Sequence, residues 1–353
     1  MRLELRPAPS ATMVWLSPVI ALLLTVVIGA ALFALLGKDP VRGLAVFFVE
    51  PLKSSYALSE LAVKATPLML CALGLAIGFR ANVWNIGAEG QLLLGAIAAG
   101  GVALLAGPGT GRWIVVFILL AGVAGGMAWA AIVAWLRDRY HANEILVSLM
   151  LVYVAQLLLA YLVYGPWKDP AGFNFPQTRR FLAVTNLPLL VEQTRMHIGL
   201  VIALAAAVVA WLYMARHYGG YQLQVGGIAP LAARYAGFSD RRALWTALLI
   251  GGGAAGLAGA LEATGPLRQL TPHVSAGYGF AAIIVAFVGR LHPLGIVFAS
   301  ILLSMFFIGG ELSQSRLGLP NSLSGVFQGV LLFCLLACDT FILYRLRWTP
   351  RLS

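Results

Sequence analysis

Long apolar runs, separated by short polar stretches, fill this sequence of 353 residues. A helix needs about 20 apolar residues to cross the hydrocarbon core of a bilayer, so each run of that length predicts one spanning helix. We expect an all-α, polytopic membrane protein with about ten spans, or nine if the short eighth run is part of a broken helix. The predicted spans are 14–36, 56–78, 90–106, 113–136, 144–164, 198–215, 243–263, 278–288, 294–309 and 323–344.

The polar stretches divide the chain without marking a second domain. We predict a single transmembrane domain over residues 14–344. Two polar stretches within it are long, and a third, over residues 44–52, has an amphipathic pattern that predicts a surface segment. The other parts are the N-terminus 1–13, the outer loop 165–196, the inner segment 216–242 and the tail 345–353.

Composition supports a membrane protein. Hydrophobic residues make up 60% of the chain and charged residues 10%, whereas soluble domains carry about 25% charged residues. The net charge of +11 comes from basic residues in loops and at the chain ends, a pattern that sets membrane topology and does not indicate nucleic-acid binding. Ten spans place both ends on one side, and the arginine distribution predicts that this side is cytoplasmic.

One polar cluster lies between two apolar runs, in the stretch from Phe79 to Gln91. An ionised group at the centre of a spanning helix costs about 2.5–3.5 kcal/mol. The cluster therefore lies in a water-accessible turn or faces a protein-lined cavity, and it is the first candidate for function. The residues that define this signature turn are Arg80, Asn85, Gly87, Glu89, Gly90 and Gln91.

The inner segment contains a second candidate site, between Gly226 and Gly237. Pro230 is suited to open a short helix there and Gly237 to close it. Ala232, Ala233 and Ala236 would give that helix a face of small residues that fits a groove. The alternative is an ordinary helix in an interfacial loop.

Charged residues near the span ends predict local pairs. Glu60 and Lys64 are one helical turn apart, in the orientation that favours a pair. Glu262 and Asp339 lie near span ends, where snorkelling or a basic partner such as Arg345 would account for them.

Several segments, taken in order, resemble one family. The stretch 79–91 is similar to an aromatic-Arg-x-Gly-x-x-Asn-Ile-Gly-x-Glu-Gly-Gln pattern, from which Asn82 departs because glycine is usual there. Together the segments resemble membrane subunits of bacterial ABC importers, in the superfamily of branched-chain amino acid and ribose permeases and its nucleoside (simple sugar) branch. The resemblance covers roughly residues 14–345. The further matching segments are 143–151, 165–170 with 176–178, 226–237, 279–280 and 289–295.

This resemblance implies a type II ABC-importer-like permease that performs no chemistry itself and has neither catalytic residues nor a metal site. The chain has no Gly-x-x-x-x-Gly-Lys-Ser/Thr motif, so ATP would be bound by a partner ATPase. The other implied partners are a second permease, as a paralogous heterodimer, and an extracytoplasmic binding protein or lipoprotein. The complex would lie among the lipids of the bacterial inner membrane. The implied docking residues are Gly226, Gly227, Pro230, Ala232, Ala233 and Gly237.

Nucleosides are the implied solute, and polar residues in or near the spans are the candidates for the pathway. Ser148 and Gln156 are two helical turns apart, nearly on one face, with Tyr153 beside them. Such groups suit a neutral, hydrogen-bonding solute, although they could equally be interhelical hydrogen bonds. The remaining candidates are Asn85 and Gln91 in the signature turn. We expect Glu89 to brace this turn, with an effect on assembly or gating and not on the choice of solute.

Two alternatives remain open at this stage. The first is an ABC permease for ribose-like or other simple sugars. The second is a secondary transporter that needs no ATPase, although the charged residues here gather at loops and do not follow a path through the membrane. An intramembrane enzyme has the least support, because no set of catalytic residue types stands at a working spacing.

Overall fold

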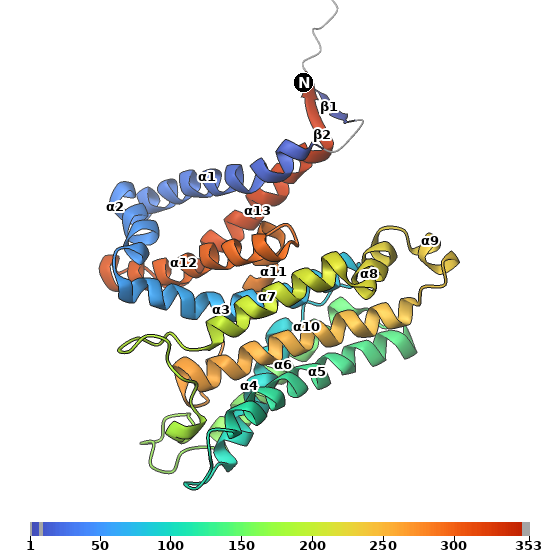
Figure 1. Cartoon of the computed structure of the whole chain (residues 1–353). Coiled ribbons are helices and arrows are strands. Elements are labelled where there is room, and N and C mark those ends of the chain that lie inside the picture. The colour runs from blue at the N-terminus through green and yellow to red at the C-terminus, as the bar shows by residue number, and fades with distance from the viewer. Residues whose placement is uncertain (1, 7–9, 348–353) are drawn as a thin grey trace, which may run out of the picture. The chain divides into compact units, whose positions relative to one another are not determined.

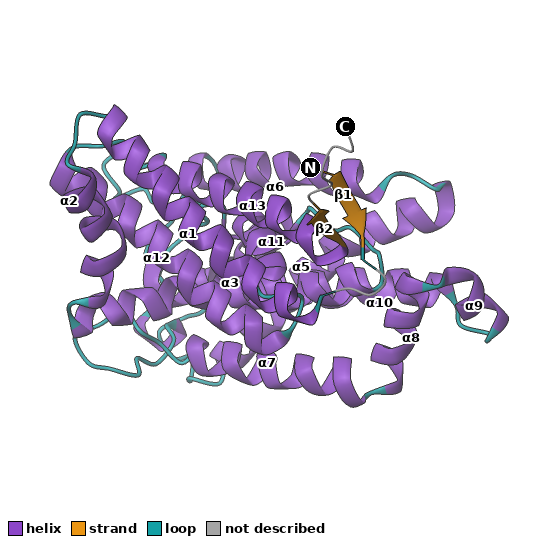
Figure 2. Ribbon diagram, turned by 90° about the horizontal axis from the view of Figure 1, so that it is seen from above, coloured by secondary structure: helices purple, strands orange, loops and turns teal. Residues whose placement is uncertain are grey.

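The computed structural model describes residues 2–6 and 10–347 and confirms the all-α prediction (Figures 1 and 2). Among the described residues, nine helices are long and apolar enough to cross a membrane, and a tenth apolar helix, Tyr278–Val288, is shorter. The predicted eighth span is therefore a short helix, as its length indicated.

The elements have the following bounds, including short π- and 3₁₀-helical turns. The helices are α1 (Ala11–Leu35), α2 (Pro40–Leu44), α3 (Ser55–Arg80), α4 (Ala88–Leu105), α5 (Ile114–Tyr140), α6 (Glu144–Tyr164), α7 (Gly199–Arg216), α8 (Tyr218–Ile228), α9 (Pro230–Tyr235), α10 (Asp240–Glu262), α11 (Tyr278–Val288), α12 (Pro293–Leu317) and α13 (Leu323–Leu343). The turns are η1 (Ala45–Val49), η2 (Glu50–Leu52), η3 (Ala183–Thr185) and η4 (Ala263–Leu267), and the strands are β1 (Arg2–Leu5) and β2 (Tyr344–Arg347).

The chain forms two compact units, one from its two ends (residues up to 58 and from 305 onward) and one from residues 59–304. In the first unit, β1 pairs with β2 in an antiparallel register that sets Glu4 opposite Arg345, and these two side chains form an ion pair of 3.1 Å. Arg345 therefore pairs with Glu4, not with Asp339 as considered above. Asp339 Oδ1 instead accepts a hydrogen bond of 2.8 Å from the Ser17 hydroxyl of α1.

The segment 44–52 has one exposed and one buried face, as its amphipathic pattern predicts: Val49 and Leu52 are exposed, whereas Val46 and Phe47 are buried. Its π-helical turn η1 directs Phe47 into the first unit, where the ring is fully buried. Phe47 stacks on Phe327 of α13 at a centroid distance of 4.2 Å and also contacts Phe306 of α12. Aromatic packing of this kind fixes the buried face of the segment.

Glycine contacts hold the second unit together at α4, α5 and α10. A Cβ atom added to Gly95 of α4 would lie 2.3 Å from Gly256 of α10, and one added to Gly126 of α5 would lie 2.1 Å from the Gly252 carbonyl. The helix backbones therefore touch, as small residues allow in membrane proteins. Figure 1 shows α5 and α10 running side by side.

The outer loop 165–196 is tied to the second unit by hydrogen bonds. The buried Thr178 exchanges two bonds of 3.0 Å with the backbone of Leu270. Arg195 binds Glu60 of α3 with both guanidinium branches, one of them at 2.9 Å. Glu60 therefore has a long-range, bidentate guanidinium partner, which is a strong form of ion pair, and its pairing with Lys64 stays a prediction.

His197 anchors the end of this loop where α7 begins. Its ring is 3% exposed and packs against Gly199 and Gly265, and Nδ1 accepts a hydrogen bond of 3.1 Å from the Gly199 N–H. Only a neutral imidazole can accept that bond. Burial lowers the pKa of His197 to about 4, from an ordinary value near 6.5.

His197 therefore predicts a loss of stability in acid. Between pH 6.5 and pH 4 the unfolded chain binds a proton at this position that the folded chain does not, so the stabilisation present above pH 6.5 is lost as the pH falls. Between pH 7 and pH 5 the loss is about 2 kcal/mol. Thermal unfolding of the detergent-solubilised chain measures it. His197→Asn keeps an acceptor for the Gly199 N–H but does not titrate, so its midpoint should depend less on pH, and equal pH dependence in both proteins would contradict this role.

Candidate functional site

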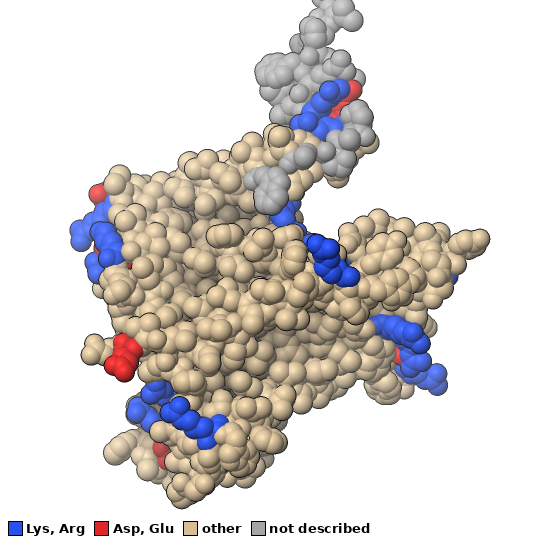
Figure 3. All heavy atoms as spheres, in the orientation of Figure 1, with Lys and Arg blue, Asp and Glu red and all other residues tan. Residues whose placement is uncertain are grey.

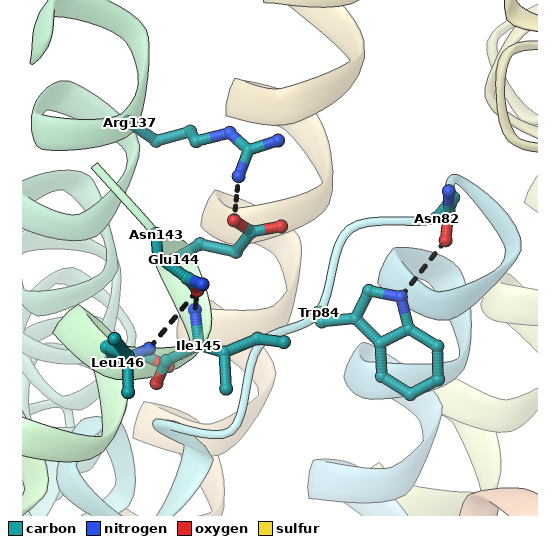
Figure 4. Close-up of polar contacts among 8 residues, drawn as sticks. Asn82, Trp84, Arg137, Asn143, Glu144, Ile145 and Leu146 are labelled. Atoms are coloured by element: carbon teal, nitrogen blue, oxygen red, sulfur yellow. Dashed lines mark hydrogen bonds and ion pairs between the residues drawn. The ribbon is translucent and has the colours of Figure 1, made fainter. Parts of the chain in front are cut away.

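The signature turn begins where α3 ends. The Asn82 N–H donates to the Phe79 carbonyl (3.1 Å) and the Val83 N–H to the Gly78 carbonyl (2.9 Å), the two bonds of a Schellman cap. Asn82 has a φ of 55°, in the left-handed region that glycine adopts freely and that asparagine tolerates better than most residues. The departure from glycine is therefore accommodated, and the Asn82 side chain accepts a hydrogen bond from Trp84 Nε1 at 3.0 Å (Figure 4).

Two amide side chains close the turn. Asn85 Nδ2 donates to Gln91 Oε1 at 2.9 Å, and Gln91 Nε2 donates back to Asn85 Oδ1 at 3.1 Å. Asn85 Oδ1 also accepts from the Gly87 N–H at 3.0 Å. Both side chains are nearly fully buried, at 3% and 1% exposure. Their polar atoms satisfy one another, which is how buried amides avoid the cost of lost hydration.

The turn rests on the first helical turns of α6. Ser148 Oγ accepts a hydrogen bond from the Ile86 N–H at 3.3 Å and donates to the Ile145 carbonyl at 3.1 Å. A Cβ atom at Gly87 would lie 2.8 Å from Ser148 Cβ, so a larger residue at position 87 would force the turn away from α6.

The start of α6 is itself fixed by polar contacts (Figure 4). The Asn143 side chain caps the helix by accepting from the Ile145 N–H (2.9 Å) and the Leu146 N–H (3.4 Å). Arg137 of α5 forms an ion pair with the buried Glu144. The turn therefore rests on a helix end whose position is well defined.

Glu89 connects the turn to the start of α11. Its carboxylate is 3% exposed and accepts a hydrogen bond of 2.7 Å from the Gly279 N–H, with further hydrogen bonds from Ser275 and the Gly277 backbone. A carboxylate suits a helix N-terminus, where N–H groups lack helical partners. A Cβ atom at Gly279 would lie 2.2 Å from the Glu89 backbone nitrogen, so the two segments touch through their backbones.

Aromatic rings support the same junction. Phe79 at the end of α3 stacks on Phe287 of α11 at 5.3 Å, and the Trp84 ring lies 5.1 Å from Phe79. Ring pairs at this separation add about 0.5–1.5 kcal/mol beyond the area they bury. The turn thus joins α3, α4, α6 and α11.

The inner segment contacts the signature turn at its other side. In α8, a Cβ atom at Gly227 would lie 2.1 Å from the Arg80 carbonyl oxygen, whereas one at the neighbouring Gly226 would meet nothing within 4 Å. The helix α9 begins at Pro230 as predicted. Gly237, with a φ of 80°, ends it through a Schellman cap in which the Phe238 N–H donates to the Ala233 carbonyl at 2.9 Å.

The face of small residues predicted for α9 is corrected in one respect. Ala233 is 1% exposed and points into the second unit, so it does not belong to an outward face. The other residues of the helix are exposed, including Arg234, and the largest of them are Leu231 and Tyr235, at 79% and 96% exposure. The exposed tip therefore carries large apolar groups.

The structure separates the five pathway candidates. Asn85 and Gln91 are partners of each other, and Ser148 binds the backbone of the turn at Ile86. Tyr153 is 56% exposed and Gln156 is also exposed, whereas Ser148 is 1% exposed. The prediction that Ser148 and Gln156 share a face is therefore wrong. A separation of eight residues turns the helix by about 80° beyond two full turns, so Ser148 faces the core and Gln156 does not.

A group of charges near the outer loop was not predicted from the sequence as a unit. Glu60 pairs with Arg195, and the charges of Lys64 and Arg195 act on the buried Glu262 of α10. These are the basic neighbours that Glu262 was expected to need. Arg195 lies 135 residues from Glu60, and no local pattern indicates such a pair.

Comparisons with known proteins agree with the resemblance. A family model described as branched-chain amino acid transport system / permease component matches residues 57–336. The glucose ABC transporter permease protein TsgB13 of Haloferax volcanii is 35% identical, over 98% of this chain and 94% of its own. The guanosine ABC transporter permease protein NupP of Bacillus subtilis is 29% identical (90% and 91%), and the nucleoside ABC transporter permease protein NupB of Lactococcus lactis is 26% identical (90% and 89%).

The first two of these organisms each have a second matching permease. The putative glucose ABC transporter permease protein TsgC13 of Haloferax volcanii covers 65% of this chain at 31% identity. The guanosine ABC transporter permease protein NupQ of Bacillus subtilis covers 72% at 27% identity.

Glu89→Ala should reduce the yield of folded protein. It leaves the Gly279 N–H and the Ser275 hydroxyl without their acceptor in a buried site, at a cost of about 1–3 kcal/mol. Glu89→Gln keeps one acceptor oxygen and should recover part of the yield. Size-exclusion chromatography of the detergent-solubilised chain measures this, with the exposed Glu192→Ala as a control. Wild-type yield and transport rate for Glu89→Ala, combined with an altered choice of solute, would contradict a bracing role.

Proposed function

We propose that this chain, which belongs to the branched-chain amino acid transport system / permease component family and is the permease subunit of an ABC importer, conducts nucleosides or related solutes. The observation that carries the proposed cargo is the match over about nine-tenths of the chain to permeases named for guanosine and nucleosides. These relatives come from two different bacteria.

The polar groups of the spans support a neutral solute. Asn85, Gln91 and Ser148 would brace the turn beside the pathway, since Asn85 and Gln91 bind each other and the Ser148 hydroxyl binds backbone groups. Tyr153 and Gln156 project from the exposed side of α6 and are the better candidates to line the pathway. An amide in a membrane span is costly against lipid and is expected to face protein or water. Hydroxyl and amide groups suit the uncharged hydroxyls of a nucleoside.

Transport would be driven from outside this chain. We assign ATP binding and hydrolysis to a separate ATPase subunit and no catalytic, cofactor or metal role to this one. The segment 216–242 would dock on that ATPase through the tip of α9, where the large exposed side chains of Leu231 and Tyr235 provide apolar contact area. The pairs of permeases in the relatives' organisms support a heterodimer with a second permease. An extracytoplasmic binding protein would deliver the solute.

The chain is a multi-pass membrane protein, and we place it in the plasma membrane with both termini in the cytoplasm. On the face shown in Figure 3, charged side chains gather at helix ends and loops and leave wide uncharged areas between them. The pairing of β1 with β2 brings these two segments together, which supports placing both of them on the same side of the membrane.

Glucose or another simple sugar is the second candidate. The relative at 35% identity is named a glucose permease, and its match covers 98% of this chain. A sugar and a nucleoside share a neutral ring with several hydroxyl groups, so the same pathway chemistry serves both. The alternative of a transporter without an ATPase loses its support, because the relatives are ABC permeases.

Uptake into proteoliposomes tests this proposal. The chain is reconstituted with its second permease and ATPase, and labelled adenosine, uridine, ribose and glucose are offered with the binding protein. We expect ATP-dependent uptake of the two nucleosides, at least tenfold above that of the sugars. Uptake of glucose or ribose alone would establish the second candidate, and uptake without ATP under a proton gradient would contradict both.

A further inference from the structure

An apolar groove of about 600 Å³ runs along the second unit between α3, α5, α7 and α10. Its walls are hydrocarbon side chains, glycines and one thioether, apart from the hydroxyl groups of Tyr213 and Thr246 at one end. Its volume is in the range of ligand pockets, which span about 300–1,000 Å³. Representative lining residues are Leu73, Ile77, Ala206, Ile250 and Leu257.

A polar cavity of about 290 Å³ adjoins this groove and shares Tyr213 and Thr246 with it. It lies where α7 ends and α10 begins, beside α8 and α9. Its charged lining side chains are Arg242 and Asp240, and Asp240 is already paired with Arg234 at 2.6 Å. The positive charge of Arg242 therefore decides which head group the cavity attracts.

The length of the groove matches one leaflet of a bilayer. Its lining residues on α10 run from Thr246 to Leu257, and these eleven steps of 1.5 Å span about 16 Å. Half of a hydrocarbon core that is about 30 Å thick is about 15 Å. The groove is therefore about as long as one leaflet's acyl region is thick, and the polar cavity adjoins it at the Thr246 end, where Arg242 and Asp240 lie.

From this combination we propose that the two cavities form one binding site for a phospholipid. One acyl chain occupies the groove, and the phosphate of the head group lies beside Arg242. A nucleoside or sugar does not fit the groove, because its hydroxyl groups would lose their hydrogen bonds there.

The bound lipid would contact both the transmembrane helices and the inner segment. The groove uses α3, α5, α7 and α10, whereas the polar cavity uses Gln222 of α8 and Ala233 of α9. The lipid is thus placed to hold α8 and α9 against the bundle, whichever solute the permease carries.

Native mass spectrometry of the full chain tests this proposal. The chain is purified in mild detergent from nanodiscs that contain phosphatidylethanolamine and phosphatidylglycerol. We expect the wild type to retain one phospholipid. Ala206→Phe fills the groove and should lower the lipid-bound fraction at least tenfold. Ala205→Phe makes the same change one position earlier on α7, at an exposed residue outside the groove, and should bind lipid like the wild type.

A second variant tests the head-group end of the site, and a crosslink identifies what occupies the groove. Arg242→Gln alters only the head-group end and should lower the lipid-bound fraction several-fold. Photo-reactive benzoylphenylalanine at position 206 should add the mass of one phospholipid on illumination. Unchanged lipid retention in both Ala206→Phe and Arg242→Gln would overturn the proposal. A crosslink from position 206 to a second protein chain would also overturn it, because it would show that a protein covers the groove.

Discussion

The carboxylate of Glu89 against the N-terminal end of α11 is the interaction on which the second unit depends. It satisfies backbone N–H groups that would otherwise be buried without a partner, and it joins helices that are far apart in sequence. The reciprocal amides of Asn85 and Gln91 close the turn beside it, and Ser148 holds the turn on α6. A polar cluster in an apolar chain is costly unless each member is paired, and here the pairing is nearly complete within the protein. The polar residues of the signature turn therefore have a structural role, and no catalytic role is needed to account for them.

The same turn also contacts the inner segment, so the turn links α8 to the spanning helices. At Gly227 the backbone of α8 rests against the carbonyl of Arg80, the last residue of α3. A movement of α8 would therefore act on the end of α3 through backbone atoms, which give way less easily than a flexible side chain. If the ATPase docks on α9 as proposed above, this contact would be a direct route from α8 and α9 to the spans.

The helices and their approximate ends could be predicted from the sequence, because the length and apolarity of a span are local properties. The turn, the start of α9 at Pro230 and its end at Gly237 have local signals as well. Contacts between distant residues could not be predicted: Arg195 is one of many arginines, and nothing near it indicates Glu60. The same holds for Asp339 with Ser17. Burial of Ala233 and exposure of Tyr153 depend on which face of a helix meets its neighbours. A helix with little contrast between apolar and polar faces does not allow that face to be predicted from its sequence.

The contact of α8 with the end of α3 is tested most directly by the number of solute molecules imported per ATP hydrolysed. This ratio is measured in the reconstituted complex for Gly227→Ala and Gly226→Ala. Both changes favour helix formation equally, by about 1 kcal/mol. Only the Cβ at position 227 meets the Arg80 carbonyl oxygen, at 2.1 Å, whereas the Cβ at position 226 meets nothing within 4 Å. We expect Gly227→Ala to lower the ratio several-fold and Gly226→Ala to keep the wild-type ratio. The same ratio in both variants would contradict this expectation.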